Sequence, residues 1–255
     1  MNLKKTILKN NFFENSNNDL SINNKNNKLN TVIFSLGGSL IYPNTININY
    51  LIEFKKFILN FIKDKNKAII VCGGGNICRE YNKSALKINK KITNENLDWL
   101  GISLTKVNAE LLRCIFQEKA YENIINNPYK TIETDKKILI AGGYKPGNSS
   151  DKMAVLLAKQ YSSKIVINLT NIDKIYDKDP KKHKNATPFS KISWKEFLKI
   201  IDDKWIPGMN VPFDPKASKI AMENNINTLI INGNNIENLK NYLEKKEYIG
   251  TIISN

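Results

Sequence analysis

The segment TVIFSLGGS, residues 31–39, decides the architecture of this chain. Its first six residues form a mainly apolar run with β-branched and aromatic side chains, which predicts a strand buried on both faces. Gly-Gly-Ser follows immediately, and glycines at the end of a buried strand let the backbone approach a ligand and donate N–H groups to an anion. A tight turn between a strand and a helix explains the same glycines, so this segment alone leaves both explanations open.

The same arrangement recurs along the chain. Residues 67–72 are followed by Gly73-Gly74-Gly75, and residues 138–141 are followed by Gly142-Gly143. Further strand-like runs lie at 164–169, 228–231 and 251–253, and helical spacing of apolar residues lies near 50–62, 97–115, 150–161, 194–201, 215–224 and 236–244. The alternation predicts an α/β fold, a three-layer αβα sandwich around a mostly parallel sheet. Ligands bind such sheets at the carboxyl ends of the strands, where these glycines lie.

The segment at 97–115 gives a strong helical pattern. Its apolar residues repeat every three or four positions, which predicts that they share the face that packs on the sheet. The expected face consists of Leu97, Leu100, Leu104, Val107, Leu111 and Ile115.

Composition limits the classes of function. The chain carries a net charge of +15, but its lysines are spread evenly and only two arginines occur, Arg79 and Arg113. Since nucleic-acid binders favour arginine for contacts to phosphates and bases, nucleic acid is not the expected partner. No apolar run reaches the roughly 18 residues of a membrane span. The three cysteines lack metal-type spacing, which favours reduced thiols in a cytoplasmic protein.

The chain divides into a tail and a domain. Residues 1–30 are polar and rich in asparagine, so we expect a disordered tail, with a short helix near residues 3–13 as its one candidate element. The strand and helix patterns occupy residues 31–255, which we expect to form one domain.

The second glycine turn, Gly73-Gly74-Gly75, carries the stronger functional signal. Three consecutive glycines cost more conformational entropy than a simple turn requires. Arg79 follows four residues later, within reach of the same anion. The segment lacks the Gly-Lys-Ser/Thr of a P-loop, so another kind of phosphate site is predicted.

Two later segments add polar groups at strand ends. Residues 142–151 (GGYKPGNSSD) place hydroxyl groups before a helix, where they suit either helix capping or a phosphate or ribose. Residues 169–180 (LTNIDKIYDKDP) offer an aromatic ring and carboxylates for a base and ribose, although an acidic loop explains them equally well. His183, the only histidine, lies among lysines, and no Cys/His metal cluster or nucleophile–base pair stands out. Repeated glycine-rich turns that can bind phosphate, in a sequence without a nucleophile–base pair, are typical of enzymes that transfer phosphoryl groups.

The order of these motifs resembles the amino acid kinase superfamily, and within it the archaeal-type uridylate (UMP) kinase family. The motifs are GGS, GGG with a downstream arginine, Asp98-x-x-Gly101, GG-x-x-PG-x-SSD and TN-x-D-x-x-Y-x-x-DP, and the resemblance covers about residues 31–255. It implies phosphoryl transfer from ATP to UMP with Mg²⁺, no membrane partner and a homohexamer. No protein metal ligands are assigned.

The resemblance also implies residue roles. Arg79, Asp151 and Asp214 would organise the transfer. UMP would be bound by Gly74, Asp98, Gly143, Tyr144, Pro146, Gly147, Asn148, Ser149 and Ser150. ATP would be bound by Gly37, Gly38, Ser39, Gly75, Arg79, Thr170, Asn171, Asp173, Tyr176 and Asp179.

Two positions depart from the superfamily pattern. Ser35 and Pro212 stand where many members carry lysines, whose charge would offset charge on the transferred group. The resemblance leaves Arg79, magnesium, or one of Lys152, Lys174 and Lys216 as substitutes. Two other functions stay open at this point: a kinase of another small phosphate or carboxylate acceptor, and a non-catalytic nucleotide sensor or nucleic-acid binder.

Overall fold

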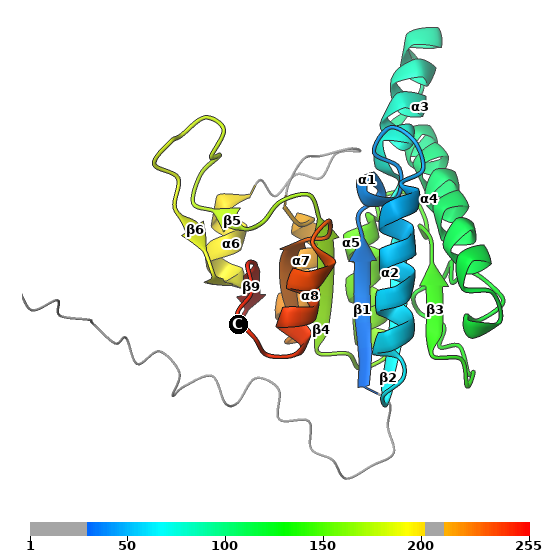
Figure 1. Cartoon of the computed structure of the whole chain (residues 1–255). Coiled ribbons are helices and arrows are strands. Elements are labelled where there is room, and N and C mark those ends of the chain that lie inside the picture. Colours follow the sequence, from blue (N-terminus) through cyan, green and yellow to red (C-terminus); the bar gives the residue numbers. More distant parts are fainter. Residues whose placement is uncertain (1–29, 202–211) are drawn as a thin grey trace, which may run out of the picture.

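The computed structural model describes residues 30–201 and 212–255 (Figure 1). The tail and the candidate helix near residues 3–13 lie outside the described residues. A seven-stranded sheet of order β3-β2-β1-β4-β8-β9-β7 forms the centre, and only its β8–β9 pair is antiparallel. Its strands are β1 (Asn30–Leu36), β2 (Asn66–Cys72), β3 (Ile138–Ala141), β4 (Ile165–Thr170), β7 (Lys191–Ser193), β8 (Asn227–Asn232) and β9 (Thr251–Ser254).

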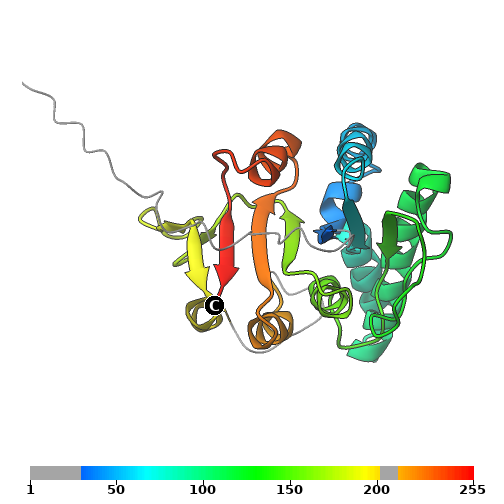
Figure 2. The same ribbon diagram turned by 90° about the horizontal axis from the view of Figure 1, so that it is seen from below.

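Helices cover both faces of this sheet (Figure 2). One face packs against α1 (Gly38–Ile41), α2 (Ile48–Phe61), α4 (Asn94–Phe116) and α8 (Ile236–Leu243). The other packs against α5 (Ser150–Gln160), α6 (Trp194–Ile200) and α7 (Pro215–Glu223). Alternate strand residues feed the two cores: Val32 and Phe34 contribute to the first, and Ile33 to the second. The continuous apolar runs therefore reflect burial on both faces, and the predicted three-layer α/β fold is confirmed.

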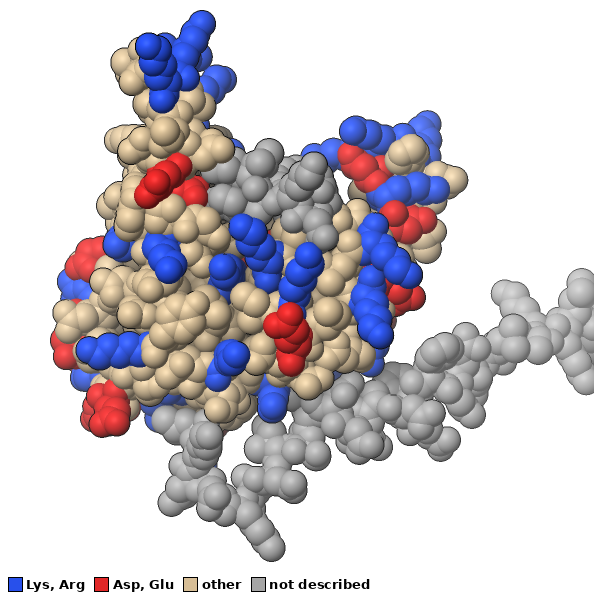
Figure 3. Space-filling view, turned by 180° about the vertical axis from the view of Figure 1, so that it is seen from behind, with Lys and Arg blue, Asp and Glu red and all other residues tan. Residues whose placement is uncertain are grey.

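Two projections rise beyond the carboxyl ends of the strands (Figure 1). One is α3 (Gly75–Ile88), which contributes no buried residue and leans on the start of α4. The other is the hairpin of β5 (Ile175–Tyr176) and β6 (Pro188–Phe189) with its long connection. Lysines cluster at both tips (Figure 3). They are Lys87, Lys90 and Lys91 on one tip and Lys178, Lys181, Lys182 and Lys184 on the other.

The predicted face of the helix at 97–115 is only partly right. Leu97 is buried and Leu111 and Ile115 pack partly against the core, but Val107 is 63% exposed. The other buried apolar residues of α4 are Ile102, Ala109, Leu112 and Phe116. The small residue Ala109 lets α4 lie close to β2 and β3. The helix is therefore rotated from the orientation that counting large apolar residues predicts, and part of its leucine face is left half-buried. Within the described part of the chain, no helix is long and apolar enough to cross a bilayer.

Candidate active site

The first two glycine turns touch each other through their main chains. A Cβ placed on Gly38 would lie 2.6 Å from the carbonyl carbon of Gly73 and would overlap the nitrogen of Gly75. Gly75 itself adopts a φ of +76°, and a Cβ there would lie 2.5 Å from the oxygen of Gly38. Gly38, Gly73 and Gly75 are therefore required, because the two backbones approach too closely for a side chain at any of them. This contact brings the loops after β1 and β2 together at one point.

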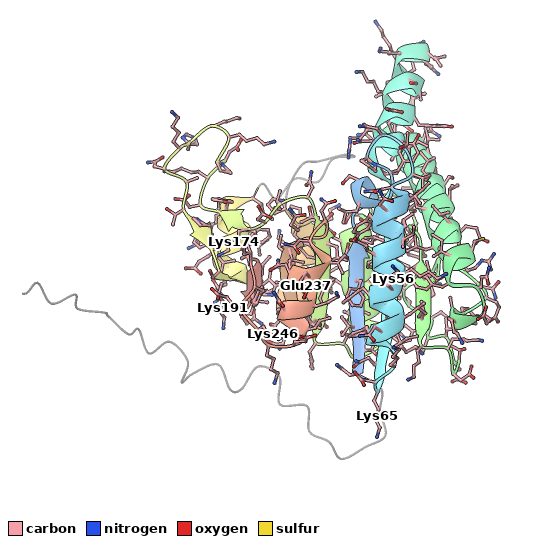
Figure 4. The ribbon with its side chains drawn as sticks, in the orientation of Figure 1. Lys56, Lys65, Lys174, Lys191, Glu237 and Lys246 are labelled. Atoms are coloured by element: carbon pink, nitrogen blue, oxygen red, sulfur yellow. The ribbon has the colours of Figure 1, made fainter. Side chains whose placement is uncertain are left out.

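A pocket of about 250 Å³ opens beside this contact. It collects many of the residues that the motifs predict for the site, from five separate stretches of chain. They are Gly74, Gly75, Arg79, Asp98, Gly143, Asn148, Ser149, Ser150, Asp151 and Asp214. A larger groove of about 1,120 Å³ lies between α2 and α8, bordered by Lys56 and Glu237 (Figure 4). Because that groove contains no glycine-turn residue, the smaller pocket is the candidate site.

Two carboxylates meet at the floor of the pocket. The main-chain N–H of Asp214 donates to Oδ2 of Asp151 at 3.2 Å, and the Ser35 hydroxyl donates to Oδ1 at 3.1 Å. Burial and then the carboxylate of Asp214 raise the pKa of Asp151 to about 7, although these two hydrogen bonds oppose the rise. Asp214 also caps α7, accepting from the N–H of Ala217 at 2.7 Å.

Lysines near this acid pair sit on the first turns of two helices. Lys152 follows Asp151 on α5, and Lys216 follows the cap of α7. Burial lowers the pKa of Lys152, the positive charges of Lys216 and Lys145 lower it further, and Asp214 raises it. Lys174, in contrast, donates to the Ser190 hydroxyl at 3.1 Å beside the β5–β6 hairpin. Of the three lysines considered as substitutes, Lys152 and Lys216 are thus the two beside the acid pair.

The opposite wall joins α4 to the loop at 143–150. Asp98 accepts from the N–H of Gly147 at 2.7 Å, and the Thr105 hydroxyl oxygen accepts from the N–H of Gly143 at 2.7 Å. These contacts hold the loop against the helix before any nucleotide binds. Tyr144 points elsewhere: its ring packs edge-on against Tyr129, with 5.9 Å between the ring centres.

Residues 30–232 match the Amino acid kinase family, which covers most of the chain. The chain belongs to this family. Among its relatives, the uridylate kinase of Pyrococcus abyssi is 33% identical over 204 residues, which span 78% of this chain and 89% of that protein. The uridylate kinase of Thermococcus sibiricus is 32% identical over 225 residues, which span 87% and 98%.

Solved structures agree with this assignment. Uridylate kinase from Archaeoglobus fulgidus matches with a TM-score of 0.74 and 31% identity, over 88% of this chain and 99% of that one. UMP kinase from Bacillus anthracis, at 21% identity and a TM-score of 0.70, shares the fold over 88% of this chain and 96% of that one. The family resemblance read from the motifs is confirmed.

In this family member, the segments assigned to ATP lie beside the β1 turn. The N–H of Gly37 donates to the oxygen of Leu169 at 2.9 Å, which places the turn against Thr170 at the end of β4. Asp173 accepts from the side chain of Asn232 at 2.9 Å, so this loop is tied to the end of β8. The assignments of Ser39, Asn171 and Tyr176 to ATP stay predictions.

Asp179 has a local contact instead. Its carboxylate accepts from the N–H of Lys181 at 2.9 Å, inside the connection between β5 and β6. This is the turn-capping pattern of an acidic loop. A role for Asp179 toward adenosine remains a prediction.

Several residues that line the pocket were not predicted from the sequence: Cys78, Asn82, Leu97, Ile102 and Thr105. Cys78 and Asn82 come from α3, a helix with no buried residue, although its apolar residues do gather on one side. Burial is the main cause that raises the pKa of the Cys78 thiol, so this group stays protonated near neutrality and is not an activated nucleophile. The side-chain oxygen of Asn82 is buried without a hydrogen-bond partner, which leaves it able to accept from a ligand donor.

Proposed function

We propose that this chain is a UMP kinase, which transfers the γ-phosphoryl group of ATP to UMP and gives UDP and ADP in pyrimidine nucleotide biosynthesis. One observation carries the proposal: a single pocket unites the Gly74-Gly75 turn, Asp98, residues of the 143–150 loop and the acid pair. The names of the relatives supply the substrate, since they are uridylate kinases that this chain matches over most of its length.

The site suits transfer by positioning and charge rather than by a covalent intermediate. The phosphate oxygen of UMP is ionised at neutral pH and needs no strong base to attack. The protein's task is to bring two anions together, for which it offers main-chain N–H groups, Arg79 and the lysines beside Asp151 and Asp214. The lysine-bearing tips on either side of the pocket would attract nucleotides over longer distances (Figure 3).

Magnesium and assembly belong to the same proposal. Among the described residues, no three Asp, Glu, His or Cys side chains form a metal-binding group. Mg²⁺ commonly takes only one or two carboxylates together with phosphates and water, so Asp151 and Asp214 fit an ion that arrives with ATP and neutralises phosphate charge when bound. By resemblance to the family we also propose a homohexamer that acts in the cytoplasm.

An acceptor panel tests the function. Purified protein is incubated with ATP and magnesium and with UMP, CMP, AMP or isopentenyl phosphate, and ADP formation is measured for each. UMP is expected to give at least about tenfold higher kcat/KM than the others, which corresponds to about 1.4 kcal/mol of discrimination. Equal or greater turnover of another acceptor would assign the chain to a different kinase of the same fold, and no turnover at all would favour a nucleotide sensor.

Arg79→Ala is expected to lower kcat roughly 100-fold with little change in the unfolding temperature, because the exposed guanidinium lines the pocket and contributes charge rather than core packing. Its only contact within the protein is to the Asn76 side chain, as far as the described hydrogen bonds show. Arg113→Ala is the matched control, since Arg113 lies on α4 and pairs with Glu110. Equal activities of Arg79→Ala and Arg113→Ala would show that Arg79 takes no part in the transfer.

Deletion of residues 1–28 is expected to leave kcat and KM within about twofold of the full chain. The pocket and the contacts around it draw on residues from Ser35 onward. Steady-state kinetics with UMP and ATP provide the measurement. A truncated protein that folds but does not turn over would show that the segment takes part in the active assembly.

A further inference from the structure

The buried side chain of Ser35 contacts the acid pair of Asp151 and Asp214 through Asp151. It is the second-to-last residue of β1, it is only 2% exposed, and its hydroxyl donates to Oδ1 of Asp151 at 3.1 Å. The hydrogen bond joins residues 116 positions apart in sequence. A buried serine on a central strand costs free energy unless its hydroxyl is bonded, and this bond satisfies it.

Both oxygens of the Asp151 carboxylate accept hydrogen bonds from uncharged donors. Oδ2 accepts from the main-chain N–H of Asp214 at 3.2 Å, opposite the Ser35 hydroxyl. On the next strand, Asn168 lies beside Ser35 in register and donates to the carbonyl of Pro212 at 3.2 Å, which anchors the segment leading to Asp214. A hydroxyl and a main-chain amide therefore set the direction of the carboxylate.

Among the described residues, the charged and titratable groups around Asp151 come from five segments. They are Lys152 on its own helix, Asp214 and Lys216 at the start of α7, Cys78 and Arg79 on α3, Asp98 on α4, and Lys145 in the loop before α5. Asp214 opposes ionisation of Asp151, and the Ser35 hydrogen bond favours it. Since β1 contributes a neutral hydroxyl at this point, Ser35 fixes the position of the carboxylate without neutralising it.

We propose that Ser35 is a positioning residue of the transfer site: it aims the carboxylate of Asp151 at the reacting phosphates and leaves its negative charge to be balanced by Lys152, Lys216 and bound magnesium. This inference rests on the proposed kinase function. It differs from a merely structural role because it links the Ser35 hydroxyl to the direction of the Asp151 carboxylate, which a measurement of stability alone would not report.

Ser35→Ala is expected to lower kcat about 10- to 30-fold while the KM values for UMP and ATP stay within about threefold, because misdirection of Asp151 affects the transfer and not nucleotide binding. Ser35→Thr keeps the hydroxyl and suits a strand, and it is expected to restore kcat.

Ser163→Ala is the matched control. Ser163 is similarly buried, and its hydroxyl donates to the carbonyl of Ile165 at 2.9 Å, just before β4 and outside the pocket. This control is expected to leave kcat unchanged. An unchanged kcat in Ser35→Ala, or a failure of Ser35→Thr to restore it, would overturn the proposal.

A second measurement separates this inference from the proposed function. Crystal structures of the wild type, Ser35→Ala and Ser163→Ala are compared for the direction of the Asp151 carboxylate. The carboxylate is expected to turn away from its wild-type direction in Ser35→Ala and not in Ser163→Ala. If the wild type fails to phosphorylate UMP while the carboxylate turns in Ser35→Ala, the positioning role stands and the kinase function is wrong. If the carboxylate keeps its direction in Ser35→Ala, the positioning role is wrong whatever the substrate is.

Discussion

Asp151→Asn is expected to stabilise the nucleotide-free protein while lowering kcat by roughly 1,000-fold. The activity falls because the site loses the negative charge that orders its cations. The stability rises because the wild-type carboxyl is held beside Asp214 in a partly buried position, where ionisation is costly. Asparagine has nearly the same shape and carries no charge.

The pH dependence distinguishes this cause from general repacking. The pKa of Asp151 is about 7 in the folded protein, against an ordinary value of 3.8. A carboxyl whose pKa is raised by folding contributes fully to stability below its unfolded pKa, and this contribution is lost as the pH rises toward and through about 7. Asp151→Asn has no carboxyl group at this position, so it does not lose this stability as the pH rises. Its advantage should therefore be small at pH 4–5 and should grow up to about pH 8.

Thermal unfolding of both proteins at a series of pH values measures the effect. At pH 8 we expect a gain of about 1–3 kcal/mol, or roughly 3–10 °C in Tm. This is below the full value of the pKa difference, because the site is partly open to solvent and the asparagine amide group can no longer accept from both Ser35 and Asp214. A variant that is less stable at pH 8, or equally stabilised at every pH, would contradict costly ionisation of Asp151 as the cause.

Gly38→Ala is expected to destabilise the fold by at least about 3 kcal/mol, with a Tm lower by roughly 6–12 °C. The new methyl group would meet the main chain of Gly73 and Gly75, not a side chain that can rotate away. Relief requires that the loops after β1 and β2 separate, which would also open the pocket. Activity should therefore fall together with stability.

Gly147→Ala provides the comparison. Gly147 adopts the same φ of +76° as Gly75, but a Cβ at Gly147 would meet nothing within 4 Å. Only the cost of the left-handed backbone remains, about 1 kcal/mol or roughly 2–4 °C. Calorimetry on both variants gives the test. A milder effect at Gly38 than at Gly147 would show that the two turns are not in rigid contact.

The fold could be predicted because its strands are buried on both faces. Runs such as residues 31–36 and 67–72 have no polar alternation, and each is followed by glycine, so both the parallel sheet and its ligand edge were readable. The short strands β5, β6 and β7 were missed because two or three residues carry no period. The helix α3 was missed although its apolar residues gather on one side, because it begins inside the glycine run and contains few large apolar residues.

Site residues could be predicted where they form a motif within a short stretch of sequence. They could not be predicted where their position depends on packing between distant segments. Glycine runs, Asp98 and the SSD triplet have recognisable spacing, and the structure places them around one pocket. The orientation of α4 depends on Ala109, whose small size matters only against β2 and β3. Likewise, the reason for Gly73 and Gly75 lies in Gly38, which is far away in sequence and invisible to any local pattern, whereas a side chain at Gly74 would meet Cys78.

The backbone contact between the two glycine turns limits how the site can change. The spacing of the loops after β1 and β2 is set where main chain meets main chain, so no side chain can adjust it. The β5–β6 hairpin and the far end of α3, in contrast, stand away from this contact (Figure 1). Substitutions in these projections can therefore alter the surroundings of the pocket while the spacing of the two turns stays constant.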